Sequence, residues 1–201
     1  MLSISEADAI EGIASGLLVK YGTTFPVRPG DMIQDEGHSV HWKAFKKRID
    51  SYSILDPEEG TAIIFINEKL REFHPRLRFT MAHELGHILL KNHNIRNDEK
   101  AADEFAACLL MPTEEFNCTW GKERAERFGV SEAAVRMRQL MLLDRTAHRL
   151  QPEKWRPLDW RNNQEIVQTF QKAIKIISQP KYTNFFEREY DLSVGFSFPI
   201  I

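Results

Sequence analysis

The sequence predicts an α+β fold in which a small antiparallel sheet packs on helices and a helical subdomain of helix-turn-helix form follows. Two β-rich runs, residues 49–55 and 61–66, flank a turn-forming segment, a pattern typical of paired antiparallel strands. After Pro75 the apolar residues change to helical spacing. The 201 residues, of which 42% are hydrophobic and 28% charged, suffice for a globular core without disulfides or a structural metal.

Each expected element has its own signal. Ser3 or Ser5 can cap an N-terminal helix that ends at Gly22. The run Ala62–Ile66 is apolar on both faces, so we expect a strand that is covered on both sides. Asn97 is a suitable N-cap for the helix that follows the first long helix after Pro75. From residue 79 onward, we expect helices at residues 79–91, 97–111, from 113, at 122–128, 132–143 and 162–178, and a strand-like segment at 192–201.

Composition and charge exclude several classes of protein. The 27 Lys and Arg residues nearly balance the 29 Asp and Glu residues, and a net charge of −2 provides no overall basic field for nucleic acid or an anionic membrane. Cys108 and Cys118 are too few for a disulfide framework or an all-cysteine zinc site. Because no apolar run is long enough to cross a membrane and the N-terminal segment lacks signal-peptide features, we expect a cytoplasmic protein with no membrane partner.

The segment His83-Glu84-Leu85-Gly86-His87 has the H-E-x-x-H pattern within a helical stretch. Residues four apart lie one turn apart on a helix, with Cβ atoms about 5–6 Å apart, so both imidazoles can reach one ion. Glu84 can then contact a water on that ion as a general base. Five residues are a short pattern that also occurs by chance, so a catalytic zinc site depends on a third protein ligand.

Two residues are candidates for this third ligand. His93 has the spacing of the longer pattern H-E-x-x-H-x-x-G-x-x-H, but position 90 is Leu, and an unbroken helix would carry His93 about 9 Å beyond His87. Glu99 opens the next helix, whose small residues allow close packing on the first. Asp103 follows by one turn and is placed to accept the free ring N–H of a ligating histidine. We therefore favour Glu99, although these acids would also suit a charged outer helix face.

The same residues carry a family resemblance. Arg78–Leu90 reads R-F-T-M-A-H-E-L-G-H-I-L-L, and Glu99–Pro112 reads E-K-A-A-D-E-F-A-A-C-L-L-M-P. Together they resemble the ImmA/IrrE family of cytoplasmic metallopeptidases, which pairs R-F-T-x-A-H-E-x-x-H with E-x-x-A-N-x-F-A-A-x-L-L-M-P. The resemblance implies that Glu99 is the third ligand, and this sequence departs from the family at Asp103, where Asn is usual. The likeness extends to about Leu143.

The resemblance implies a zinc metalloendopeptidase with one zinc ion per chain, held by His83, His87 and Glu99. Zinc would make hydroxide available at neutral pH and polarise the substrate carbonyl, while Glu84 would accept the water proton and deliver it to the leaving amine. The implied substrate is a regulatory protein, in particular a helix-turn-helix transcriptional repressor, in which the enzyme makes limited cuts. We expect the peptidase domain at residues 1–115, a helix-turn-helix-like subdomain at 116–150 and a C-terminal extension at 151–201.

Two parts of the chemistry stay open at this stage. The strand at residues 61–67 can pair with an extended substrate by strand addition, or it can be a buried structural strand. His74, Tyr52 and Arg78 are all candidates for stabilising the oxyanion.

The segment 125–135 has the form of a helix-turn-helix, with Gly129 at the turn and Ser131 capping the second helix. Residues 121–150 hold seven Lys and Arg against four Asp and Glu, and Arg136 and Arg138 could point outward. The segment therefore fits either an ordinary helical subdomain or a DNA-binding module. The alternative functions are a DNA-binding regulator, or a toxin–antitoxin interaction protein, with a non-catalytic zinc site in which Cys108 is the candidate fourth ligand.

Overall fold

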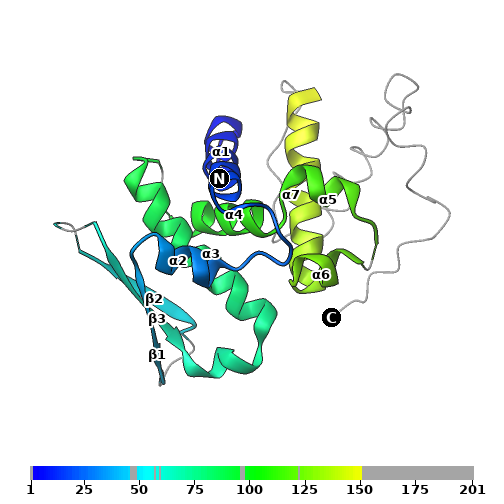
Figure 1. Ribbon diagram of the computed structural model, residues 1–201. Helices are drawn as coiled ribbons and strands as arrows, with labels where there is room; N and C mark the ends of the chain where they lie inside the picture. Colours follow the sequence, from blue (N-terminus) through cyan, green and yellow to red (C-terminus); the bar gives the residue numbers. More distant parts are fainter. Residues whose placement is uncertain are drawn as a thin grey trace. The chain divides into compact units, whose positions relative to one another are not determined.

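The computed structural model describes residues 2–45, 49–56, 58, 60–95, 98–121 and 123–150. Its elements are α1 (Ile4–Tyr21), α2 (Pro29–Asp35), β1 (Ser39–Lys43), β2 (Ser51–Leu55), β3 (Ala62–Asn67), the 3-10 helix η1 (Glu68–Glu72), α3 (His74–Asn92), α4 (Glu99–Leu110), α5 (Thr113–Cys118), α6 (Glu123–Phe128) and α7 (Glu132–Leu150) (Figure 1). The α+β prediction is confirmed; β1 and α2 were not predicted. The helix predicted at 162–178 and the strand-like segment at 192–201 lie outside the described residues.

The chain up to Leu142 forms one compact unit, and the last described turns of α7 belong to a second unit that begins at Leu143. The first unit thus includes residues from both of the first two predicted domains. A separate peptidase domain that ends at residue 115 stays a prediction.

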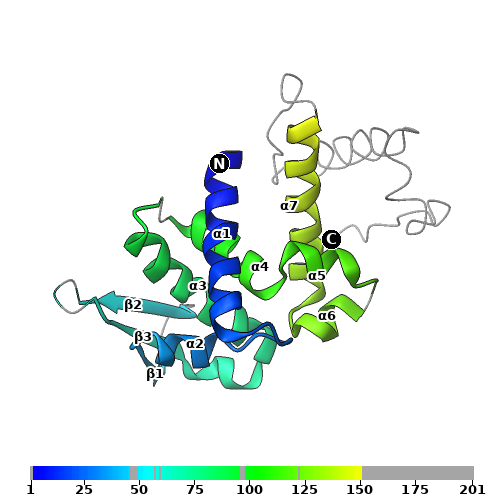
Figure 2. The same cartoon turned by 45° about the horizontal axis from the view of Figure 1, so that its top comes forward.

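The sheet has the strand order β1-β3-β2, with β3 in the centre. β2 pairs antiparallel with β3, as predicted, and β1 pairs parallel with it. Ile64 and Ile66 are fully buried, whereas Ile63 is 42% exposed, so the prediction of a strand covered on both faces is wrong. The reason is that α2 contacts β1 and α3 contacts β2 (Figure 2), while Ile63 alternates along β3 with the buried Ile64 and Ile66 and so points to the opposite face.

Helix α4 packs against both α3 and α1 (Figure 2). Its small residues Ala101, Ala102 and Ala106 are fully buried, which agrees with the close packing expected from the sequence. At the contact with α3, a Cβ added to Gly86 would lie 2.9 Å from Cδ1 of Phe105, so no larger residue fits there without movement. The two helices therefore approach closely enough for their side chains to form one site.

The N-terminus of α4 begins one residue later than predicted. Asp98, not Asn97, is the N-cap, and its side chain accepts a hydrogen bond from the amide of Ala101. Glu99 is consequently the first residue of the helix. This start directs Glu99 toward α3.

The helix-turn-helix-like segment is present, with Ser131 accepting a hydrogen bond from the amide of Ala134 at the start of α7. Arg136 is exposed and pairs with Glu132, whereas Arg138 is fully buried and does not point outward. Its guanidinium donates to the carbonyl of Met111 at 3.0 Å, among other partners. The sequence pattern of α7 could not show that other elements provide hydrogen-bond acceptors for the Arg138 side chain.

Within the described residues, no helix is long and apolar enough to cross a membrane.

Candidate metal centre

Helix α3 places His83 and His87 on the same side, one turn apart. Their ring centroids lie 4.7 Å apart, and their Nε2 atoms lie 3.1 Å apart. Both side chains are mostly buried, with 16% and 21% exposed. The burial of the α3 residues around them, such as Leu85 and Ile88, fixes this face of the helix.

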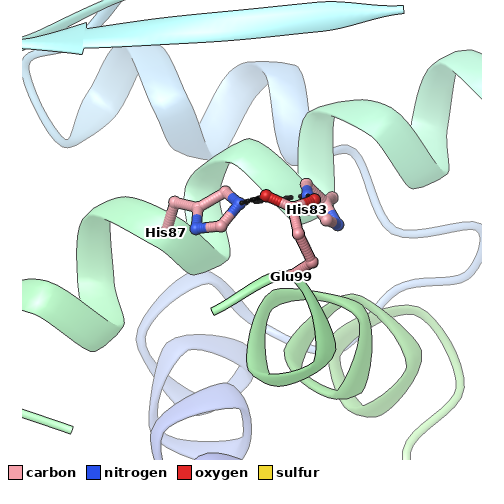
Figure 3. A group of neighbouring side chains, drawn as sticks. All are labelled: His83, His87 and Glu99. Carbon is pink, nitrogen blue, oxygen red and sulfur yellow. Dashed lines mark hydrogen bonds and ion pairs between the residues drawn. The ribbon is translucent and has the colours of Figure 1, made fainter. Parts of the chain in front are cut away.

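Glu99 reaches from the first turn of α4 toward both histidines (Figure 3). One carboxylate oxygen lies 3.4 Å from Nε2 of His83, and the other lies 3.5 Å from Nε2 of His87. Glu99 itself is 83% exposed, so this corner of the site is open to solvent. Among the described residues, these three form the one group of histidine, cysteine and acidic side chains whose geometry can hold a metal ion.

The donor atoms fit a zinc ion. In a tetrahedral site with zinc–ligand distances of about 2.0–2.2 Å, neighbouring ligand atoms lie about 3.3–3.6 Å apart. Here the two Nε2 atoms lie 3.1 Å apart, and each lies 3.4 or 3.5 Å from a different carboxylate oxygen of Glu99; one donor atom from each residue lies within 4.8 Å of the other two. Two imidazoles and one carboxylate are also the type of three-ligand set found in catalytic zinc sites, which leave a fourth position open.

Asp103, one turn after Glu99, accepts a hydrogen bond from Nδ1 of His83 at 2.8 Å. This contact assigns the ring proton to Nδ1 and leaves the lone pair of Nε2 directed at the other donors. Burial by itself lowers the pKa of His83, but the hydrogen bond and charge of Asp103, together with the nearby carboxylates, raise it above its ordinary value. His83 thus lies in a negative environment that favours a cation.

Glu84 is buried, with 5% exposure, and lies beside the two histidines on α3. Its Oε1 accepts a hydrogen bond of 2.5 Å from the hydroxyl of Ser51, at the start of β2. The sheet therefore holds the Glu84 carboxylate through a hydrogen bond from β2.

All these residues line one cleft of about 610 Å³. Its lining consists of Asp50, Ser51, Tyr52, Ser53, Phe79, Thr80, His83, Glu84, His87, Glu99 and Asp103. The edge strand β2 and the preceding Asp50 form one wall, and α3 and α4 contribute the remaining residues. A buried carboxylate and a set of potential metal ligands thus face the same space.

Residues 33–139 match the IrrE N-terminal-like domain, a family of peptidases. The match covers just over half of the chain and includes every residue of the cleft. The chain belongs to this peptidase family. Membership confirms the resemblance seen in the two motifs and implies that the substrate is a protein. A comparison with curated proteins finds no significant match.

Several residues that the sequence offered as metal ligands or oxyanion stabilisers lie outside the cleft. His93 is the exposed C-cap of α3 and is absent from the cleft lining. Cys108 is buried on α4, where its sulfur lies 3.4 Å from Nη1 of Arg138, and it is not part of the group that could hold a metal ion. The histidine at position 74 is exposed at the first residue of α3 and does not line the cleft.

The other two oxyanion candidates have structural contacts instead. Arg78 donates hydrogen bonds to the carbonyls of Val27 and Gly129, which tie α3 to two loops. Burial lowers the pKa of Arg78. The ring of Tyr52 stacks on Phe65, on the outer face of the sheet, with centroids 4.9 Å apart. His74 and Arg78 are thus absent from the cleft lining, whereas Tyr52 is part of it although its ring stacks on Phe65.

The central position of β3 also decides the open question of the strand. Both of its edges are paired, with β1 and with β2, so it is a structural strand and has no edge for a substrate. The strand at the edge of the sheet and beside the cleft is β2.

Sequence reasoning missed Ser51 as a residue of the site. A serine within a β-rich run has no spacing that signals a role, and its partner Glu84 is 33 residues away. Only the pairing of β2 with β3 brings it over α3.

Proposed function

We propose that this protein is a zinc metalloendopeptidase that makes limited cuts in a helix-turn-helix transcriptional repressor. The observation that carries the proposal is the convergence of His83, His87 and Glu99 beside the buried carboxylate of Glu84 in one cleft. A metal-assisted hydrolase is expected to have three protein ligands and, beside them, a carboxylate that does not bind the metal.

In the proposed site, one zinc ion is held by Nε2 of both histidines and by the carboxylate of Glu99. When bound, zinc supplies a Lewis acid that polarises the substrate carbonyl and lowers the pKa of water. Asp103 holds the ring of His83 in orientation through Nδ1.

Glu84 is the proposed general base and acid. Its carboxylate accepts a proton from the attacking water and then donates it to the amine that leaves. Burial of the side chain keeps bulk water away from the carboxylate, which strengthens its interactions with reacting groups. The amide nitrogen receives the proton, so the carboxylate returns to its starting state.

We propose that β2 binds the substrate as an added strand. Since β2 is an edge strand of the sheet and lines the cleft, its backbone can pair with an extended peptide. Such binding requires a segment of the substrate that can become extended. Exposed loops and linkers meet this requirement and folded helices do not, which favours limited cuts.

The assignment of a repressor as substrate rests on the family resemblance, and co-expression tests it. The chain is expressed with each of a panel of helix-turn-helix repressors, and intact repressor and its fragments are measured by immunoblotting. We expect two fragments from at least one repressor with the native chain, and intact repressor with Glu84→Gln, which keeps its zinc.

A matched control is Glu114→Gln, which changes an exposed carboxylate on α5 outside the cleft and should leave cleavage unchanged. Equal amounts of fragments from the native chain and Glu84→Gln, or no cleavage of any protein by the native chain, would contradict the peptidase proposal. Cleavage of unrelated proteins but of no repressor would contradict the substrate class alone.

A further inference from the structure

The hydroxyl of Ser51 is the one hydrogen-bond donor to the Glu84 carboxylate among the described residues. The donor–acceptor distance is 2.5 Å, and the contact joins the edge strand β2 to helix α3. It occupies Oε1 and leaves Oε2 without a hydrogen bond to any described group. Short hydrogen bonds to a carboxylate are stronger than those between neutral groups.

The start of β2 is held firmly over α3 by further contacts. Asp50, the neighbour of Ser51, forms an ion pair of 2.6 Å with Arg76, which is on α3 itself. The buried Asn67 donates its backbone amide to the carbonyl of Asp50 and its side-chain amide to the carbonyl of Ile49, both at 2.8 Å. Asp50, just before β2, and Ser51, its first residue, thus bind two residues of α3, and Ser51 has little freedom to move away.

We propose that Ser51 is a positioning residue for Glu84. A glutamate side chain has three rotatable torsions, and an unheld carboxylate would sample several rotamers. By donating to Oε1, Ser51 holds the group in one orientation in which Oε2 receives and returns the proton. The strand that borders the cleft thereby also orients the proposed base. This inference rests on the proposed role of Glu84.

The bond is tested first by thermal unfolding of the full chain, a measurement independent of activity. Ser51→Ala should lower Tm by about 3–6 °C in the native background and by almost nothing in a Glu84→Ala background. Ser53→Ala is the matched control, because Ser53 lies on the same strand and lines the same cleft. Its effect on Tm should be the same in both backgrounds.

The positioning role is tested by kinetics on a fluorogenic peptide that spans the cleavage site of the repressor cut by the native chain. Ser51→Ala should lower kcat about tenfold and leave KM within about twofold, at unchanged zinc content. Ser51→Thr, which keeps the hydroxyl, should recover most of kcat. Should Ser51→Ala not fold, Ser51→Cys gives the same contrast, since a thiol of similar size is a weak donor.

The outcomes separate the two proposals. Equal Tm effects of Ser51→Ala in both backgrounds would contradict the bond itself, whatever the activity. Coupled Tm values with an unchanged kcat would show that Ser51 stabilises the fold without positioning the base. Full activity of Glu84→Gln would instead contradict the proposed function and leave the measured coupling of Ser51 and Glu84 as a structural fact.

Discussion

Asp103 and Glu104 are consecutive on α4, and their side chains enter two charged clusters of different character. Asp103 is half exposed and bonds His83 at the cleft. Glu104 is 8% exposed and lies 3.6 Å from the guanidinium of Arg138, which has no exposure. Adjacent helix residues point about 100° apart, so one helix can supply both clusters.

The buried cluster, which contains Glu104 and Arg138, is formed by contacts within the chain. Arg138 donates to the carbonyl of Met111, to the hydroxyl of Thr113 at 3.1 Å, and to the sulfur of Cys108, and it lies 3.4 Å from the carboxylate of Glu11. The hydroxyl of Thr113 and the thiol of Cys108 in turn donate to Glu11 and Glu104, so donors and acceptors alternate. The cluster joins α7 to α1, α4 and the start of α5.

The open cluster at the cleft, which contains His83, His87, Glu99 and Asp103, has a different composition. The Nε2 atoms of His83 and His87 and both oxygens of Glu99 converge, and all four are electron-pair donors when the rings are neutral. Such an arrangement favours a cation among them. The comparison teaches that converging acceptors beside a cleft indicate a binding site, whereas a closed set of matched partners indicates a structural one.

The largest expected effect comes from removing a ligand of the open cluster. Glu99→Ala should lose zinc on dialysis and abolish cleavage, because two histidines alone do not complete a stable site. Elemental analysis and the repressor assay measure both. His93→Ala is the control and should keep zinc and activity; zinc retained by Glu99→Ala and lost by His93→Ala would reverse the ligand assignment.

A substitution in the buried cluster should lower the stability of the fold. Arg138→Ala removes a fully buried guanidinium that lies 3.6 Å from the carboxylate of Glu104, and it should lower the free energy of unfolding by about 3–5 kcal/mol. Arg136→Ala, two residues earlier on the exposed face, should change it by less than about 0.5 kcal/mol. Denaturant titrations measure both variants, and equal effects would show that the buried contacts of Arg138 contribute no net stability.

A smaller effect tests the helix contact that brings the open cluster together. Gly86→Ala places a methyl group 2.9 Å from Cδ1 of Phe105 and should cost about 1–3 kcal/mol and weaken zinc binding. Gly12→Ala on α1 is the matched helical control, because nothing lies within 4 Å of its added Cβ. It should stabilise the protein by up to about 1 kcal/mol. A Gly86→Ala variant as stable as Gly12→Ala would show that α3 and α4 have room to separate.

Much of the site-bearing fold could be predicted because its signals are local. Helical spacing predicted α3 and α4, and the H-E-x-x-H pattern lies within one turn of α3. Glu99 and Asp103 could be inferred because the small residues of α4 indicate close packing on a neighbour. The antiparallel pair β2 and β3 follows from two β-rich runs beside a turn.

The rest depends on contacts between residues far apart in the sequence. The partner of Arg138 on α1, Glu11, is 127 residues away, so the sequence pattern alone could not show that this cation is buried. β1 is five residues long and shows no alternation strong enough to predict a strand, and it forms through its parallel pairing with β3. That pairing makes β3 central, which the sequence could not show.

The smallest predicted effect concerns a histidine outside both clusters. His38 is 8% exposed, and its Nδ1 accepts a hydrogen bond of 3.2 Å from the amide of Ala62, at the start of β3. Burial lowers the pKa of His38, and the charge of Glu36 opposes this only in part. The environment thus favours the neutral ring, in contrast to His83, whose pKa is raised.

The sign of the pH dependence follows from this direction. Below a pH of about 6.5 the unfolded chain binds the proton of His38 more readily than the folded chain does, so the free energy of unfolding falls as pH decreases toward the folded pKa. The slope from one group is at most about 1.4 kcal/mol per pH unit. His38→Asn keeps an acceptor near the position of Nδ1 but does not titrate. The stability difference between the native chain and this variant should therefore be constant above pH of about 7 and change in favour of the variant in acid; a difference that is constant down to pH of about 5 would contradict the lowered pKa.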